Sequence, residues 1–271
     1  MVDDGEIIVH TSWRFVISMY TDLQKASIWK RISAALLDVI FLSIVVAFFA
    51  MLLSSALGFD RYDAALDECY AKYETQYGIS FDVTLEQFST MSEEQAQPYV
   101  DAYDALATDP DAIYNMNMII RLTMVIASIS LLLGYLLFEF AVPLIFKNGQ
   151  TIGKRVFGIG VMRAHGIRIN TVSLFIRTVL GKFTIETMIP VLIILMIFWG
   201  TIGIVGPLVI FGIAILQVVL LVTSPSNSVI HDRLSDTVVV DMGSQMIFDT
   251  EDDLVEYTKR IHAEKASKQV Y

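Results

Sequence analysis

Three long apolar stretches, separated by polar segments, dominate the pattern of the chain. The first covers residues 32–57, and its only charged side chain is Asp38; the second covers residues 122–146, and its only charged side chain is Glu139. At about 1.5 Å of rise per residue, each stretch is longer than the roughly 30 Å hydrocarbon core of a bilayer. The pattern therefore predicts two transmembrane helices here.

The third stretch, residues 188–223, carries no charge and is too long for one crossing. A single straight helix of this length would extend about 54 Å, far beyond one bilayer. Glycines and a proline between positions 200 and 207 interrupt it, and these residues punctuate helices. We predict a helical hairpin that crosses at 184–199 and 204–223. A re-entrant hairpin is the alternative, and both arrangements return the chain to the side from which it came.

The polar segments complete the predicted fold, an all-α membrane protein with four transmembrane helices. Residues 58–116 repeat apolar side chains at helical spacing, which predicts an insertion of two or three short amphipathic helices. Residues 172–183 mix apolar and basic side chains as an interfacial amphipathic helix does. The remaining segments are an N-terminal region at 1–31, a loop at 147–171 and a tail at 224–271.

Two short β-like pieces lie in the loop that follows the second predicted helix. Residues 156–162 and 167–169 flank a turn that contains Gly166, a pattern that predicts a small β-hairpin. Isolated hairpins are marginally stable, so we expect this one to pack against another segment on the same side of the membrane. The β-branched run at 237–240 is the candidate for that segment.

The basic residues are distributed very unevenly between the polar segments. The loop at 147–171 has five basic residues and no acid, whereas residues 58–117 have thirteen acids and two basic residues. Short loops rich in lysine and arginine stay on the cytoplasmic side of a membrane. We therefore expect the N-terminus, this loop with its hairpin, and the tail to be cytoplasmic, and the acidic insertion to lie outside a bacterial plasma membrane.

Composition agrees with a membrane protein and excludes several other classes. The chain is 55% hydrophobic and only 18% charged, and its mean hydropathy is +0.59. The net charge of −10 gives no basic footprint for nucleic acid. The single cysteine, Cys69, has no intramolecular disulfide partner, and the sequence contains no Cys/His metal spacing. We expect no cofactor and no metal, and contact with the lipid bilayer.

Arg31 and Asp38 are the first candidates for a site. Seven steps of about 100° bring them back to nearly the same face of a helix, with Asp38 about 10 Å deeper than Arg31. A carboxylate inside a membrane is costly and faces protein or water rather than lipid. Asp38 therefore serves either as an ion, proton or substrate site or as half of a structural ion pair with Arg31 or Arg177.

Glu139 is predicted to lie at the same depth as Asp38. The two carboxylates could form a pair that exchanges protons if they face each other. Pairing of Glu139 with Arg177 or another base near the inner side of the membrane is equally compatible with the sequence. Lys182 and Glu186 are four residues apart, and we predict that they form a local pair.

Three blocks of residues resemble the RDD family of small bacterial membrane proteins. KRISAALLD at 30–38 resembles the start of the family's first helix, where an arginine is followed by an aspartate inside the helix. NGQTIGKRVFGI at 148–159 resembles the loop after its second helix, and HDRLSDT at 231–237 resembles its closing motif. The blocks occur in the family's order within about residues 25–240. The insertion is longer than the family pattern.

The resemblance implies a cluster of Arg31, Asp38 and Asp232, because the family is named for one arginine and two aspartates. The secondary candidates are Glu139 and four residues of the same blocks, Lys154, Arg155, His231 and Asp236. His231, Asp232 and Asp236 could together bind a metal. Alternatively, Asp232 accepts hydrogen bonds from the basic loop or caps a helix, and we favour this second interpretation.

The resemblance also implies a possible role in transport, because cation/proton exchange has been proposed within the family. The first hypothesis is thus a transporter of a small solute or cation that uses Asp38, and it would need a homo-oligomer or a partner subunit to line a pore. The second is a non-transporting scaffold that binds a partner through the acidic insertion or the tail. An enzyme is not expected, because no nucleophile–base or metal motif is present.

Overall fold

The computed structural model describes residues 23–192 and 205–268, which are mostly helical and include one two-stranded sheet. Contacts divide the chain into two compact units. The described parts of Met1–Val46 and Leu131–Tyr271 form the first, here called the core unit. Ala47–Ser130 form the second, here called the insertion unit. The mainly helical character predicted from the sequence is confirmed.

Three helical segments of the described chain are long and apolar enough to cross a membrane. The first is α2 (Ile28–Leu57). The second, Pro110–Phe146, consists of α6 (Pro110–Gly134), a π-helical segment η1 (Tyr135–Ala141) and α7 (Val142–Phe146). The third lies in α11 (Val205–Thr223). The predicted crossing at 184–199 lies partly outside the described residues, so the count of four helices stays a prediction.

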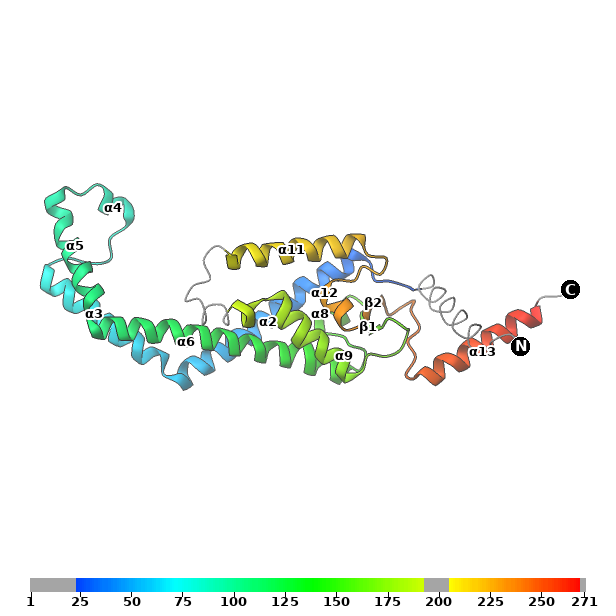
Figure 1. The fold of residues 1–271 in the computed structure, drawn as a ribbon. Coiled ribbons are helices and arrows are strands. Elements are labelled where there is room, and N and C mark those ends of the chain that lie inside the picture. The colour runs from blue at the N-terminus through cyan, green and yellow to red at the C-terminus, as the bar shows by residue number, and fades with distance from the viewer. Residues whose placement is uncertain (1–22, 193–204, 269–271) are drawn as a thin grey trace, which may run out of the picture. The chain divides into compact units, whose positions relative to one another are not determined.

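The insertion unit is helical, in line with the apolar spacing of its sequence. It contains α3 (Phe59–Tyr77), α4 (Leu85–Ser89) and α5 (Glu93–Thr108), and α5 folds back on α3 (Figure 1). The buried cluster of this unit, from α3, α5 and the start of α6, consists of Leu66, Cys69, Tyr73, Leu106 and Ala112. Asp109 accepts hydrogen bonds from Lys72 Nζ (2.9 Å), the Tyr73 hydroxyl (2.8 Å) and the Asp111 N–H (2.8 Å). This carboxylate therefore joins the start of α6 to α3.

The sheet of the core unit joins segments that are far apart in the sequence. Strand β1 (Ile159–Arg163) pairs antiparallel with β2 (Thr237–Asp241), with Val161 opposite Val239. The predicted local hairpin does not form as a pair of strands, because residues 167–169 contribute only isolated bridges, from Arg168 to Met162 and from Ile167 to Phe248. The β-branched run at 237–240, the predicted packing partner, is confirmed as the segment that pairs with β1. Both strands are almost fully buried, and pairing with this apolar run buries more of β1 than a short hairpin could.

Two short helices contact the sheet (Figure 1), α8 (Ile152–Val156) at β1 and α12 (Ile230–Leu234) at β2. A third, α9 (Thr171–Phe175), leads into a second π-helical segment, η2 (Ile176–Glu186), and α13 (Glu251–Lys268) ends the described chain. Residues 172–183 are helical, in α9 and η2, and their placement at the membrane interface stays a prediction. Arg177, Thr178, Gly181 and Phe183 of η2 are buried, and Arg177 and Lys182 pair with Asp232 and Glu139.

Candidate functional site

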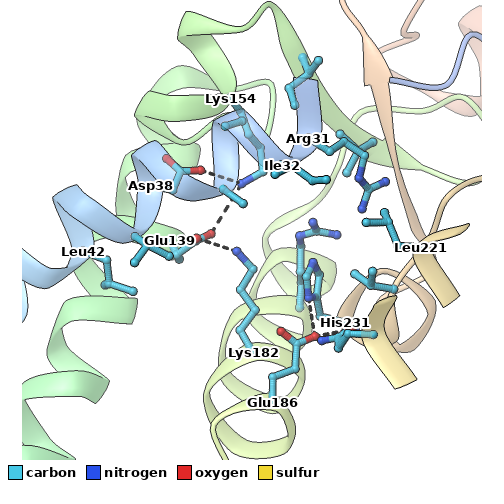
Figure 2. A pocket seen from close by; sticks show the side chains of 18 of the residues that line it. Arg31, Ile32, Asp38, Leu42, Glu139, Lys154, Lys182, Glu186, Leu221 and His231 are labelled. Carbon is cyan, nitrogen blue, oxygen red and sulfur yellow. Dashed lines mark hydrogen bonds and ion pairs between the residues drawn. The ribbon is translucent and has the colours of Figure 1, made fainter. Parts of the chain in front are cut away.

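A cavity of about 340 Å³ lies inside the core unit and is lined by both charged and apolar side chains. Helices α2, α11 and α12 and the π-helical segments η1 and η2 contribute to it. Figure 2 shows charged side chains from α2, η1, α8 and η2 converging on this space. The acidic and basic side chains of the lining are Arg31, Asp38, Glu139, Lys154, Arg177, Lys182, Glu186 and His231.

Asp38 fixes the segment that contains α8 against α2. Its Oδ1 accepts the Gly153 N–H at 2.7 Å, and its Oδ2 accepts the Thr151 hydroxyl. Lys154 Nζ lies 3.5 Å from the same Oδ2. A Cβ on Gly153 would overlap the carbonyl oxygen of Ala34, so only glycine permits this approach. The expected ion pair between Asp38 and Arg31 is not formed, because Arg31 has another partner.

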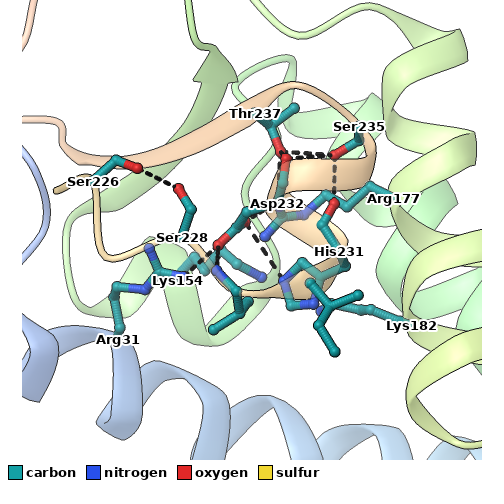
Figure 3. A network of polar contacts seen from close by, with 12 residues as sticks. Arg31, Lys154, Arg177, Lys182, Ser226, Ser228, His231, Asp232, Ser235 and Thr237 are labelled. Carbon is teal, nitrogen blue, oxygen red and sulfur yellow. Dashed lines mark hydrogen bonds and ion pairs between the residues drawn. The ribbon is translucent and has the colours of Figure 1, made fainter. Parts of the chain in front are cut away.

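That partner is Asp232, which also binds Arg177 (Figure 3). Arg31 Nη2 lies 2.6 Å from Asp232 Oδ2, and the Arg177 guanidinium donates to Asp232 Oδ1 and, at 2.7 Å, to Thr237 Oγ1. Burial of Asp232 opposes its ionisation, yet Arg177 and Arg31 together hold the pKa of this carboxyl well below its usual range. Asp232 is thus an ionised, fully buried bridge between α2, η2 and α12.

Asp232 also stabilises the start of its own helix. Its Oδ2 accepts the N–H of Val229 at 3.1 Å, the residue that precedes α12. Of the two roles that the sequence indicates for Asp232, hydrogen bonds from the basic loop or capping of a helix, the structure shows the capping. Its two guanidinium partners come from α2 and η2 and not from the loop at 147–171.

Glu139 lies between two lysines (Figure 2). Lys182 Nζ is 2.6 Å from its Oε1, and Lys154 Nζ is 3.8 Å from its Oε2. Glu139 therefore pairs with bases from η2 and α8 and not with Arg177. The Thr178 hydroxyl donates to the backbone carbonyl of Glu139 at 3.0 Å, which ties η2 to η1 next to this pair.

Lys154 connects the carboxylates of Asp38 and Glu139. It is buried, and its Nζ also donates to Thr151 Oγ1 at 3.0 Å. Burial lowers the pKa of the Lys154 ammonium to about 8, although Glu139 and Asp38 act in the opposite direction. Lys154 is consequently a side chain that can exchange its proton near neutral pH.

The predicted local pair between Lys182 and Glu186 is wrong. Lys182 binds Glu139, and Glu186 Oε1 lies 2.5 Å from His231 Nδ1. Burial and the nearby Arg177 lower the pKa of His231, which favours the neutral ring. A Cβ on Gly181 would lie 2.6 Å from His231 Cβ, so a glycine at this position lets α12 approach η2.

Two secondary candidates lie apart from this charge network. Arg155 is exposed and stacks over the ring of Phe146, with its Cζ 4.4 Å from the ring centroid. Asp236 is exposed and lies 3.5 Å from His165 Nε2. In the part of the chain that the structure describes, no group of three or more His, Cys, Asp or Glu side chains is arranged to hold a metal.

The structure thus groups the main candidates into two adjoining clusters around one cavity. Arg31 contacts Asp232 directly, while Asp38 lines the same cavity as Arg31 but binds Thr151, Gly153 and Lys154. Sequence reasoning did not single out Thr151. The π-helical winding of η1 and η2 also has no evident signal in the sequence, although segments of this kind occur frequently at functional sites.

Long apolar helices, together with charged side chains that are paired inside the protein, are typical of an integral membrane protein. Comparison with known protein families matches residues 25–236, most of the chain, to the RDD family. The chain therefore belongs to the RDD family, as its three sequence blocks indicate. No curated protein and no solved structure matches the chain.

Proposed function

We propose that this protein is a transporter of a small solute, and that the cavity of the core unit is its transport site. The observation that carries the proposal is the arrangement of Glu139 between Lys154 and Lys182 at the edge of that cavity. Ionisable residues within membrane helices are costly and are typical of substrate and proton pathways. Purely structural pairs would not need a cavity of about 340 Å³, which is large enough for a small ligand.

The two lysines and Glu139 supply the proposed coupling to protons. Lys154 can release its proton near neutral pH, and Glu139 can then be compensated by Lys182 alone. Asp38 is assigned a structural role in this scheme, since both its oxygens accept hydrogen bonds from the α8 segment. The protein performs no covalent chemistry on its solute in this proposal.

Membrane placement is part of the same proposal. The basic loop at 147–171 and both termini face the cytoplasm, and the acidic insertion at 58–116 lies outside the plasma membrane. The three candidate spans among the described residues are too few to enclose a transport pathway by themselves. In this proposal the transporter therefore works as a homo-oligomer or with a partner membrane subunit.

Flux measurement on purified protein tests the proposal. Proteoliposomes that contain a pH-sensitive dye are given a pH jump, and small organic and inorganic ions are supplied in turn. Transport predicts a solute-dependent change in internal pH that protein-free liposomes lack. Lys154→Gln should abolish the change, whereas Arg155→Gln, a neighbouring exposed base outside the cavity, should retain it.

The second candidate is a non-transporting scaffold. The observation that favours it is the separate compact insertion unit, whose side chains include the 90% exposed Leu85. Absence of flux for every ion tested, together with capture of a membrane partner that is lost when the insertion is replaced by a short linker, would support the scaffold.

A further inference from the structure

We infer that the cavity of the core unit binds an organic anion, with one carboxylate or phosphate group at Arg31 and an apolar body against α2 and α11. The inference deepens the proposed function by naming its substrate class, and it rests on that proposal only for the claim that the ligand is transported. Binding itself can be measured without flux.

Arg31 has a hydrogen-bond donor without a partner among the described residues. The Arg31 side chain is 91% buried and lines the cavity, and its Nη2 is bound to Asp232. Its Nη1 is buried without a hydrogen-bond partner among the described residues. A guanidinium only donates hydrogen bonds and stays charged, so its missing partner must be an acceptor. Carboxylates and phosphates match the geometry of the guanidinium fork and bear the complementary charge.

The acids that line the cavity already have partners. Asp38 accepts from Thr151 and Gly153, Glu139 contacts Lys154 and Lys182, and Glu186 contacts His231. A metal cation or an amine entering the cavity would have to displace one of these partners. The four bases of the lining (Arg31, Lys154, Arg177 and Lys182) are balanced by the three acids of the lining and by Asp232, which binds both arginines. An anion is favoured because it can accept from Arg31 Nη1 without displacing any of these partners.

The rest of the cavity wall is apolar on the α2 and α11 sides. Ile32, Val39 and Leu42 of α2 and Val218 and Leu221 of α11 line the cavity beside the charged groups. A small inorganic anion would leave these apolar side chains unused, whereas an alkyl or aryl body would bury itself against them. The complementary ligand therefore combines a single anionic group with an apolar body.

Binding of octanoate to the purified full chain in an uncharged detergent tests this inference. The probes are octanoate and octyl phosphate. Octylamine and octanol are controls for the negative charge, and acetate is the control for the alkyl chain. Isothermal titration and thermal unfolding provide two readouts. We expect octanoate and octyl phosphate to bind at least tenfold more tightly than the controls.

Two matched variants locate the site. Ala35→Trp fills the cavity from α2 without removing a charge, and it should weaken octanoate binding at least tenfold. Leu36→Trp, at the next position of the same helix, is 63% exposed and outside the cavity, so it should bind as wild type does. Arg31→Lys keeps a positive charge for Asp232 but lacks a second amino group, and it should weaken binding while the protein remains folded.

The outcomes separate this inference from the proposed function. Equal or tighter binding of octylamine, or octanoate binding unchanged in Ala35→Trp, overturns the anion site even if the protein carries a cation flux. Octanoate binding that is lost in Ala35→Trp supports the site even if no flux is found. Competition by phosphatidylglycerol, but not by phosphatidylcholine, would assign the anionic group to a lipid headgroup; its absence would assign a water-soluble solute.

Discussion

Asp38 on α2 and Gly153 on α8 are joined by a hydrogen bond of 2.7 Å between the Gly153 N–H and Asp38 Oδ1, across 115 positions of the chain. Together with the Thr151 hydroxyl, this bond uses both oxygens of the carboxylate. The acid that the sequence offered as a coupling site therefore holds the α8 segment in place, and Lys154 reaches Glu139 from that segment.

Asp38→Asn should destabilise the folded protein. An amide offers only one acceptor oxygen, so the Thr151 hydroxyl or the Gly153 N–H loses its partner and Lys154 loses a nearby negative charge. Breaking a buried pair in this way costs roughly 3–5 kcal/mol. Thermal unfolding in detergent measures the loss. Asp241→Asn, which removes a more exposed pair with Lys30, should cost about 0–1 kcal/mol. Equal unfolding temperatures for Asp38→Asn and wild type would contradict the structural role.

Gly153→Ala tests the close approach of α8 to α2. The added methyl group would overlap the Ala34 carbonyl oxygen and meet Asp38 Oδ1 at 2.7 Å, so the segment must move. Overpacking of this kind typically costs about 1–3 kcal/mol. Gly212→Ala on α11 is the control, because a Cβ added there would have nothing within 4 Å. If both variants unfold at the wild-type temperature, α8 does not approach α2 closely enough to require glycine.

Lys154 predicts a particular dependence of stability on pH. Its pKa is about 8 in the folded protein against an ordinary value of 10.5, so the unfolded chain binds more protons between these two values. Stability rises with pH wherever the unfolded state binds more protons. The free energy of unfolding of wild type, relative to Lys154→Met, should therefore increase from about pH 8 toward pH 10.5. A flat or falling difference across this window would show that the pKa of Lys154 is not shifted downward.

Cysteine labelling tests the proposed orientation. Cys69 is buried and burial raises the pKa of its thiol, so it is a poor probe and is replaced by alanine. In that background, an impermeant maleimide added to intact cells should label Leu85→Cys in the insertion unit. Arg155→Cys, also exposed, should react only after the membrane is permeabilised. The reverse pattern would invert the topology.

Much of the fold could be predicted because apolar runs of sufficient length specify helices in a membrane. Asp38 and Glu139 are predicted as site residues from the sequence because each is the only charged side chain in a long apolar run. The strand pairing could not be predicted in full, because β1 alone does not determine whether it pairs locally or with β2 across most of the chain. The long-range partner prevails because it buries both strands.

The partners within the candidate site were less predictable than its members. Helical spacing put Arg31 on the face of Asp38 and Lys182 near Glu186, but each of these bases binds an acid from a different element. Spacing along one helix identifies residues that share a face and cannot identify what packs against that face. The π-helical winding of η2 adds to the difficulty, since it changes which side chains align.

The central claim is that the charges around Glu139 form a working transport site and are not inert ion pairs. Replacing both members of one pair by hydrophobic residues, as in Glu139→Met with Lys182→Met, removes the proposed site, and Lys154 keeps Asp38 as a charged neighbour. Replacing both partners of a buried pair by hydrophobic residues of similar volume is often neutral for stability, so this double variant should remain folded. Flux in proteoliposomes should then fall to the level of protein-free vesicles, while the unfolding temperature stays near that of wild type. A folded double variant that transports at the wild-type rate would contradict the account.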